Sequence, residues 1–268
     1  MKQSLTELFS SLLQAISELK SVVSIGKSGG QALPTDKESD IDVFVFCSRI
    51  PDRTERNGVV GKLGVAVTGL QLSETGGPFW GVCDFVRIDE AEICLMYFTR
   101  QDIDREIVSV LEGTRLDREG GYFYPTGRCA SILSMHLYID RDGYIAGWKN
   151  RLSDYPQELA EKLYSHHIRC VCDEEDFERA VARRDVLFFH AVLEGGLDHF
   201  LQAIFALNRC FFPSRKRSLQ YLESFARKPE KCAERLLRAV ELGAQQDTLA
   251  QAYEIWSGLC VELKKMAR

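Results

Sequence analysis

The chain contains the sequence VVSIGKSGG at residues 22–30 and, after an eight-residue polar connection, SDIDVFVF at residues 39–46. The runs at 22–25 and 40–46 are each typical of a short buried strand. Because successive side chains of a strand alternate between its two faces, Asp40 and Asp42 are expected on one face, while Ile41 and Val43 point into the packing. The sequence therefore predicts a strand, a glycine-containing turn and a second strand that carries two adjacent carboxylates.

Two carboxylates held side by side repel each other unless a positive charge lies between them. Magnesium binds one or two carboxylates and completes its octahedron with substrate phosphates, so Asp40 and Asp42 indicate a metal–phosphate site. The preceding Ser28, Gly29 and Gly30 form a turn whose backbone can approach a phosphate and present N–H groups to it. The alternative is a solvated edge strand after a glycine-rich hairpin, where two unpaired charges on so apolar a run would be costly.

This pattern resembles the signature of the polymerase-β-like nucleotidyltransferase superfamily, in which a Gly-Gly or Gly-Ser turn precedes Asp-x-Asp on a strand. Here Gly29-Gly30 is followed by nine residues and then by Asp40-Ile41-Asp42. In a second register, Lys27-Ser28 takes the Gly-Ser position and the spacing becomes eleven, and both registers stay open. The resemblance covers residues 20–100 and implies a nucleotide-binding domain.

A predicted hairpin supplies candidates for a third carboxylate. The sequences VCDFVRI (82–88) and AEICLMYF (91–98) alternate on either side of a two-residue turn. Members of the superfamily carry a third carboxylate on a strand beside the Asp-x-Asp strand, and the resemblance implies Glu92 for this role. Cys94 lies on the same predicted face and is the other position at which a family aspartate could stand, in which case the third acid has been lost. Asp84 is a further alternative, and Glu92 could also be an ordinary exposed strand residue.

The two halves of the chain differ in periodicity. Residues 132–139 are predicted to form the last strand of the first half, and from residue 146 onward helical periodicity dominates, which is best explained as a bundle. We therefore predict an α+β fold, with an N-terminal nucleotidyltransferase domain (1–144) of a mixed β-sheet and flanking helices, followed by a C-terminal helical domain (145–268). This size and layout are similar to those of the aminoglycoside and lincosamide nucleotidyltransferases.

A basic cluster in the helical half is a candidate phosphate contact. An apolar helix ends at Pro213 and is followed by Arg215, Lys216 and Arg217. In antibiotic nucleotidyltransferases of this size a lysine of the helical domain contacts the triphosphate, and the resemblance implies Lys216 for this role. A charge run at a helix boundary is also typical of solvated surface, so both interpretations stay open.

The resemblance implies a complete reaction. Asp40, Asp42 and Glu92 would hold two Mg²⁺ ions that bridge the phosphates of a nucleoside triphosphate, with ATP expected. Glu92 would also act as general base towards an acceptor hydroxyl, which attacks the α-phosphorus while pyrophosphate leaves. The acceptor stays unidentified, with a small molecule such as an antibiotic as one candidate. The alternatives are a non-catalytic or antitoxin-like binding protein of the same fold, and an enzyme that nucleotidylates a protein or an RNA.

Composition limits the location and partners that we expect. The net charge of −5 argues against nucleic acid as the main partner, and no run approaches the length of a membrane span. Nine scattered cysteines without a secretory signal indicate reduced thiols in a cytoplasmic protein, for which a homodimer is one possible assembly. His166 and His167 with Cys170 and Cys172 do not have the spacing of a common structural zinc site.

Overall fold

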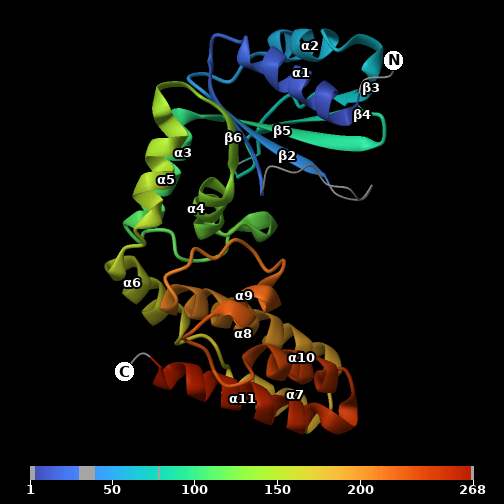
Figure 1. Cartoon of the computed structure of the whole chain (residues 1–268). Helices are drawn as coiled ribbons and strands as arrows, with labels where there is room; N and C mark the ends of the chain where they lie inside the picture. Colours follow the sequence, from blue (N-terminus) through green and yellow to red (C-terminus); the bar gives the residue numbers. More distant parts are fainter. Residues whose placement is uncertain (1–3, 30–39, 78, 267–268) are drawn as a thin grey trace. The chain divides into compact units, whose positions relative to one another are not determined.

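The computed structural model describes residues 4–29, 40–77 and 79–266, which pack as two compact units (Figure 1). The sheet unit comprises the described residues up to Val108 together with Ser131–Asp154. The helical unit comprises Ser109–Ala130 and the described residues from Tyr155 onwards, so the chain passes between the units three times. Domain limits at 1–144 and 145–268 stay a prediction, because a compact unit is not by itself an independently folding domain.

The sheet unit is built on a six-stranded sheet with the strand order β3-β4-β5-β2-β1-β6. Its strands are β1 (Val22–Lys27), β2 (Ile41–Cys47), β3 (Val67–Gln71), β4 (Val82–Ile88), β5 (Ala91–Thr99) and β6 (His136–Asp140). The central pair, β2 and β5, is parallel, and every other neighbouring pair is antiparallel. A mixed sheet followed by a helical region confirms the predicted α+β fold.

One face of the sheet is covered by α1 (Leu5–Ser17) and α2 (Arg53–Gly61), which lie on the same side of the strands (Figure 1). The core residues of α1 recur every three or four positions and include Leu8, Leu12 and Ile16. This spacing places them on one side of the helix, against the apolar residues of the strands. Each helix begins with a capping box, in which the N-cap side chain and a glutamate three positions later each accept the other's backbone N–H.

The opposite face of the sheet carries aromatic side chains. Phe44, Phe46 and Phe98 stack with ring centroids 6.0–6.3 Å apart. Tyr144, the first residue of α5 (Tyr144–Ser153), packs edge-on against Phe46, and its hydroxyl donates to Asp104 of α3 (Arg100–Leu111) at 2.9 Å. Asp42 belongs to the same face because it precedes Phe44 by two residues on β2.

The helical unit is formed mainly by α6 (Gln157–His167), α7 (Glu174–Arg183), α8 (Val186–Leu207), α9 (Ser218–Ser224), α10 (Cys232–Gly243) and α11 (Leu249–Lys265). Short 3-10 turns lie at Gly120–Tyr122 and Gln246–Thr248 in this unit, and at Gly64–Ala66 and Arg141–Gly143 in the sheet unit. At Gly196 of α8 a Cβ atom would lie 2.7 Å from the carbonyl oxygen of Val171 and 3.0 Å from Trp256, so the close approach there requires glycine. None of the helices in the described ranges combines the length and apolarity that crossing a membrane requires.

The segment 109–130 belongs to the helical unit through specific contacts. The hydroxyl of Tyr124 donates to Asp198, and the hydroxyl of Thr126 donates to the carbonyl oxygen of Phe212 at 3.0 Å. Gly127 packs so closely that a Cβ atom would lie 2.6 Å from the carbonyl oxygen of Pro213. The helical unit therefore includes residues from the N-terminal half of the chain.

The predicted strand at 132–139 is correct only in its second half. Residues Pro125–Ser134 form α4, and the strand β6 begins at His136. Cys129 and Ile132 are both fully buried and lie three positions apart, which is the spacing of a helix face and not of a strand. The apolar content of this stretch was recognised, but its period was assigned wrongly.

Candidate active site

Asp40 and Asp42 lie at the start of the central strand β2. Asp40 directly precedes the strand, Asp42 is its second residue, and both side chains are exposed. Ile41 and Val43 are buried in the core, so the alternation expected from the sequence is present. Two carboxylates are thus presented to solvent at the beginning of a rigid strand in the middle of the sheet.

The turn after β1 is joined to this strand by the backbone. The N–H of Ser28 donates to the carbonyl oxygen of Asp42 at 2.9 Å. Gly29 follows with a φ of +72°, a conformation that favours glycine, and no atom of the described residues, its chain neighbours aside, lies within 4 Å of the position that a Cβ would take. None of these described residues therefore obstructs the approach of a ligand to the backbone at Gly29. Gly30, the third residue predicted to contact phosphate, lies outside the described residues.

Lys27 is a charged residue of the site that the sequence interpretation did not assign. It ends β1, is 5% exposed, and its Nζ donates to the carbonyl oxygen of Ser28 at 3.2 Å. Burial lowers the pKa of Lys27, and the negative charge of Asp42 opposes this effect, so the two side chains lie within electrostatic range. The sequence signal that could have identified this residue is the lysine at position 27, where one register of the family signature expects glycine.

Strand register separates the candidates for the third carboxylate. In the parallel pair β2–β5, Asp42 lies opposite Cys94. In the antiparallel pair β4–β5, Glu92 lies opposite Arg87, and its carboxylate accepts a hydrogen bond from that guanidinium at 2.8 Å. Hydrogen bonding with Cys83, burial and the charges of Asp42 and Asp40 all raise the pKa of the Cys94 thiol. The residue nearest in register to Asp42 is therefore a protonated thiol.

Asp84 has a structural role on the other face of the sheet. It is 1% exposed, forms an ion pair with Arg56 of α2, and accepts the backbone N–H of Ser73 at 3.0 Å. Burial raises the pKa of Asp84, while the bonds from Arg56 and Ser73 oppose that shift. Since Arg56 reaches Asp84 from the helices that cover the α1–α2 face, Asp84 does not face Asp42 and is removed as a candidate third ligand.

The three predicted metal ligands do not form a ready-made set. Of all the histidine, cysteine, aspartate and glutamate side chains in the described residues, one group of three has ligand atoms within 4.8 Å of one another, and it lies in the helical unit. Asp40 and Asp42 nevertheless fit magnesium, which needs only one or two carboxylates and takes its other ligands from water and phosphate. The Cys94 thiol does not fit this hard ion.

Lys216 belongs to the helical unit and lies between α8 and α9, with an exposed side chain. Its neighbour Arg215 has a structural function, because its guanidinium contacts Asp198 at 2.9 Å and Glu194 at 2.7 Å. Of the basic cluster, Arg215 is thus held inside the helical unit. The assignment of Lys216 to a triphosphate stays a prediction.

Comparison with known proteins defines the class of fold. A family model described as a domain of unknown function (DUF4037) matches residues 124–217, and no curated protein matches the sequence. The structure is similar to the crystal structure, at 1.90 Å resolution, of a nucleotidyltransferase-like protein from Exiguobacterium sibiricum 255-15. The TM-score is 0.50 at 12% identity, over 98% of this chain and 75% of that one. The chain therefore has a nucleotidyltransferase-like fold; a specific similarity to aminoglycoside nucleotidyltransferases stays a prediction.

Proposed function

We propose that the protein is a metal-dependent nucleotidyltransferase that moves a nucleoside monophosphate from a nucleoside triphosphate, with ATP expected, to a hydroxyl group of an acceptor. The observation that carries this proposal is the pair Asp40 and Asp42, exposed at the start of the central strand of a nucleotidyltransferase-like fold. The backbone of Ser28 and Gly29 adjoins them and provides the close approach that a phosphate needs.

In this proposal Asp40 and Asp42 hold Mg²⁺, with Glu92 as a further ligand to a second ion. The ions, when bound, neutralise the charge of the phosphates and of the attacking and leaving oxygens. Ser28, Gly29 and Gly30 cradle the outer phosphates, and Lys216 neutralises them. Lys27 supplies a positive charge within electrostatic range of Asp42, which limits the repulsion between the two carboxylates.

Glu92 would take the proton from the acceptor hydroxyl, whose oxygen then forms a bond to the α-phosphorus as the bond to pyrophosphate breaks. For this role its carboxylate must exchange the guanidinium of Arg87 for the hydroxyl. Both side chains of this ion pair are substantially exposed, 56% for Arg87 and 38% for Glu92, and exposed pairs are weak enough to be exchanged. A small molecule, with antibiotics as one class, is the acceptor that we propose to test first.

A second candidate is a non-catalytic, antitoxin-like binding protein of the same fold. The specific observation in its favour is the thiol of Cys94 opposite Asp42, with Glu92 paired to Arg87 instead.

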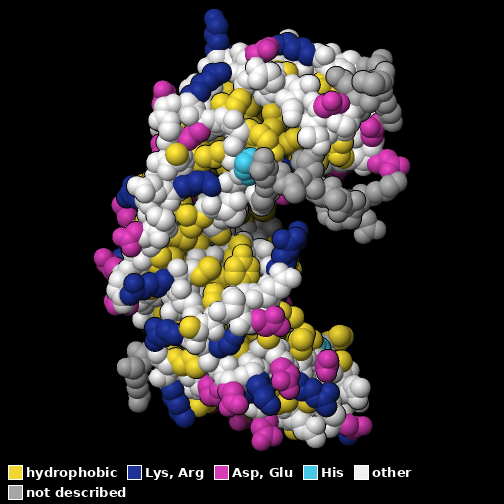
Figure 2. Space-filling view, in the orientation of Figure 1, with side chains coloured by type: hydrophobic (Ala, Val, Ile, Leu, Met, Phe, Trp, Pro, Cys, Tyr) yellow, Lys and Arg dark blue, Asp and Glu magenta, His cyan; other side chains and the backbone are white. Residues whose placement is uncertain are grey.

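A third candidate is an active enzyme whose acceptor is a protein or an RNA. On the visible face of the helical unit acidic and basic side chains are interspersed (Figure 2), and this face offers RNA no extended basic patch. None of the nine cysteines forms a disulfide. A cytoplasmic location and a homodimer remain part of the proposal.

The first experiment is calorimetric titration of each nucleoside triphosphate, with and without Mg²⁺, into the wild type and the Asp40→Ala/Asp42→Ala variant. Glu234→Ala/Glu254→Ala removes two exposed acidic residues from α10 and α11 and is the matched control. Magnesium-dependent binding that is lost only in the first variant supports the site. A folded wild type that binds no triphosphate would refute the enzyme and leave the binding-protein alternative.

A further inference from the structure

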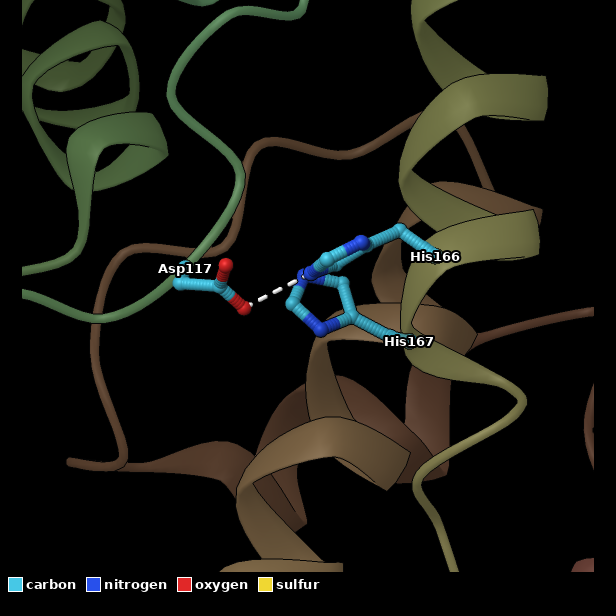
Figure 3. Close-up of side chains that lie close together, drawn as sticks. All are labelled: Asp117, His166 and His167. Atoms are coloured by element: carbon cyan, nitrogen blue, oxygen red, sulfur yellow. Dashed lines mark hydrogen bonds and ion pairs between the residues drawn. The ribbon is translucent and has the colours of Figure 1, made fainter.

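Two adjacent histidines and an aspartate lie together in the helical unit, and none of the three belongs to the proposed nucleotidyltransferase site. His166 and His167 end α6, and Figure 3 shows both imidazole rings directed towards Asp117, which lies in the connection that precedes α4. The Nε2 atom of His166 lies 2.7 Å from a carboxylate oxygen of Asp117. Ligand atoms of all three residues lie within 4.8 Å of one another.

The cluster has one anchored side and one open side. His167 is fully buried, and its Nε2 lies 3.0 Å from the carbonyl oxygen of Leu116. The side chains of His166 and Asp117 are 31% and 61% exposed. A hydrated ion can therefore reach the cluster from solvent, while the buried imidazole provides a ligand in a fixed position.

We propose that His166, His167 and Asp117 bind a divalent transition-metal ion of the zinc class, with the remaining coordination position open to water. Imidazole nitrogens suit zinc, nickel and copper, whereas magnesium and calcium prefer ligand sets made of oxygen alone. Two histidines and one carboxylate form a set of three protein ligands that zinc commonly uses when it keeps an open position.

Two changes bring the group to the geometry of a zinc site: the metal replaces the bond between Nε2 of His167 and the carbonyl oxygen of Leu116, and Asp117 moves away from His166. Zinc–nitrogen bonds of about 2.0–2.1 Å place neighbouring tetrahedral ligands roughly 3.3 Å apart. The oxygen of Asp117 would move outward by roughly half an ångström from its present 2.7 Å contact with His166 to reach such a spacing. Asp117 is the most exposed of the three side chains, so the group that must move is the one with the greatest freedom to do so.

His199 of α8 is placed to orient the buried ligand. Its Nδ1 lies 2.9 Å from the Nδ1 of His167, so one of these nitrogens must donate a proton and the other accept it. In the metal-free protein the carbonyl oxygen of Leu116 can only accept, so Nε2 of His167 carries the proton and Nδ1 accepts from His199. A metal bound to Nε2 replaces the bond to Leu116 and requires the proton on Nδ1, which then donates to His199. His199 is therefore a positioning residue that fixes the tautomer of a ligand, as the outer partners of metal-bound histidines generally do.

Sequence spacing could not reveal this set, because Asp117 precedes His166 by 49 residues. The thiols of Cys170 and Cys172, which made zinc worth considering, are not members of the group. A bound ion would join the connection at Asp117 to the end of α6 within the helical unit. We therefore expect it to stabilise that unit as well as to offer a coordination position.

The experiment uses the full chain, stripped with a chelator and titrated with Zn²⁺ alone against a chromophoric competitor. Its background is Cys170→Ser/Cys172→Ser, so that the thiols nearest in sequence cannot supply adventitious ligands. We expect one equivalent to bind, Co²⁺ to give the visible absorption of a site with nitrogen ligands, and Zn²⁺ to raise the melting temperature. Asp117→Asn and His166→Gln, which change exposed groups and leave buried His167 in place, should each weaken binding at least tenfold.

His199→Gln should weaken Zn²⁺ binding by about 10–100-fold, as loss of an outer partner usually does. His190→Gln, elsewhere on α8, is the matched control and should leave the affinity unchanged. Wild-type affinity in the Asp117→Asn/His166→Gln double variant, or the absence of stoichiometric Zn²⁺ binding by folded protein, would overturn the proposal. Triphosphate binding is measured separately and does not enter this result.

Discussion

The buried ion pair between Arg56 and Asp84 gives the sharpest quantitative prediction for the sheet unit. Their side chains are 4% and 1% exposed, and Arg56 also donates to the carbonyl oxygens of Pro51 and Ser73. Arg56→Met removes the cation and leaves the buried carboxylate of Asp84 with the backbone N–H of Ser73 and without its ion-pair partner. Breaking a buried pair in this way costs about 3–5 kcal/mol, so we expect a loss of that size in the free energy of unfolding.

The pH dependence of the loss tests its cause. Burial already raises the pKa of Asp84, and the bonds from Arg56 oppose the shift, so the pKa rises further in Arg56→Met. An acid whose pKa is raised on folding stabilises the protein at low pH, and this stabilisation is lost as pH rises through the folded-state pKa. The deficit of the variant should therefore shrink as pH is lowered from neutrality towards the unfolded-state pKa of about 3.9.

Urea unfolding followed by circular dichroism, at several pH values, measures both effects. Arg53→Met is the matched control, because Arg53 pairs with Glu74 at the surface with 55% and 71% of the side chains exposed, and its loss should cost several times less. Arg56→Met/Asp84→Leu removes both charges and should recover much of the stability. Equal losses in Arg56→Met and Arg53→Met, or a deficit that grows on acidification, would refute the reasoning.

Three further predictions concern packing and the candidate active site. Gly196→Ala should destabilise the helical unit by about 1–3 kcal/mol in thermal unfolding, because the new methyl group meets Val171 and Trp256. Gly195→Ala should not, because no described atom outside its own helix backbone and chain neighbours lies within 4 Å of the new methyl group. If the protein is a nucleotidyltransferase, Glu92→Gln should keep magnesium-dependent ATP binding and lose turnover by at least a hundredfold. Turnover that is retained in Glu92→Gln and lost in Cys94→Ser would show that turnover depends on Cys94 and not on Glu92. Lys27→Met should weaken ATP binding about tenfold by removing a positive charge within electrostatic range of Asp42, and unchanged affinity in calorimetry would contradict that function.

Much of the sheet was predictable because its signal is local. Alternating residues located β2 to within one residue, and the runs at 82–88 and 91–98 correspond to β4 and β5. The two-residue turn between these strands also fixes their register, so the pair Arg87–Glu92 could have been predicted from the sequence. At 132–139 the apolar content was visible, but the same residues fit either a helix or a strand over so short a length.

The candidate site was predictable only in part, because some of its contacts join distant segments. Asp40 and Asp42 follow from strand alternation, and Ser28 from its place after β1. The position of Cys94 opposite Asp42 depends on the parallel pairing of β2 and β5, whose register no short turn determines. The burial of Lys27 likewise results from the packing around the strand ends and has no counterpart in the local pattern.

The three passages of the chain between its units bear on how this gene could have been assembled. A fragment that begins at residue 145 would lack Tyr124, Thr126 and Gly127, which pack against residues of α8 and the segment that follows it. The matched family region, residues 124–217, likewise includes parts of both units. Recombination at a single point between the two halves would separate residues that pack together within the helical unit. We therefore expect the two halves to be inherited together.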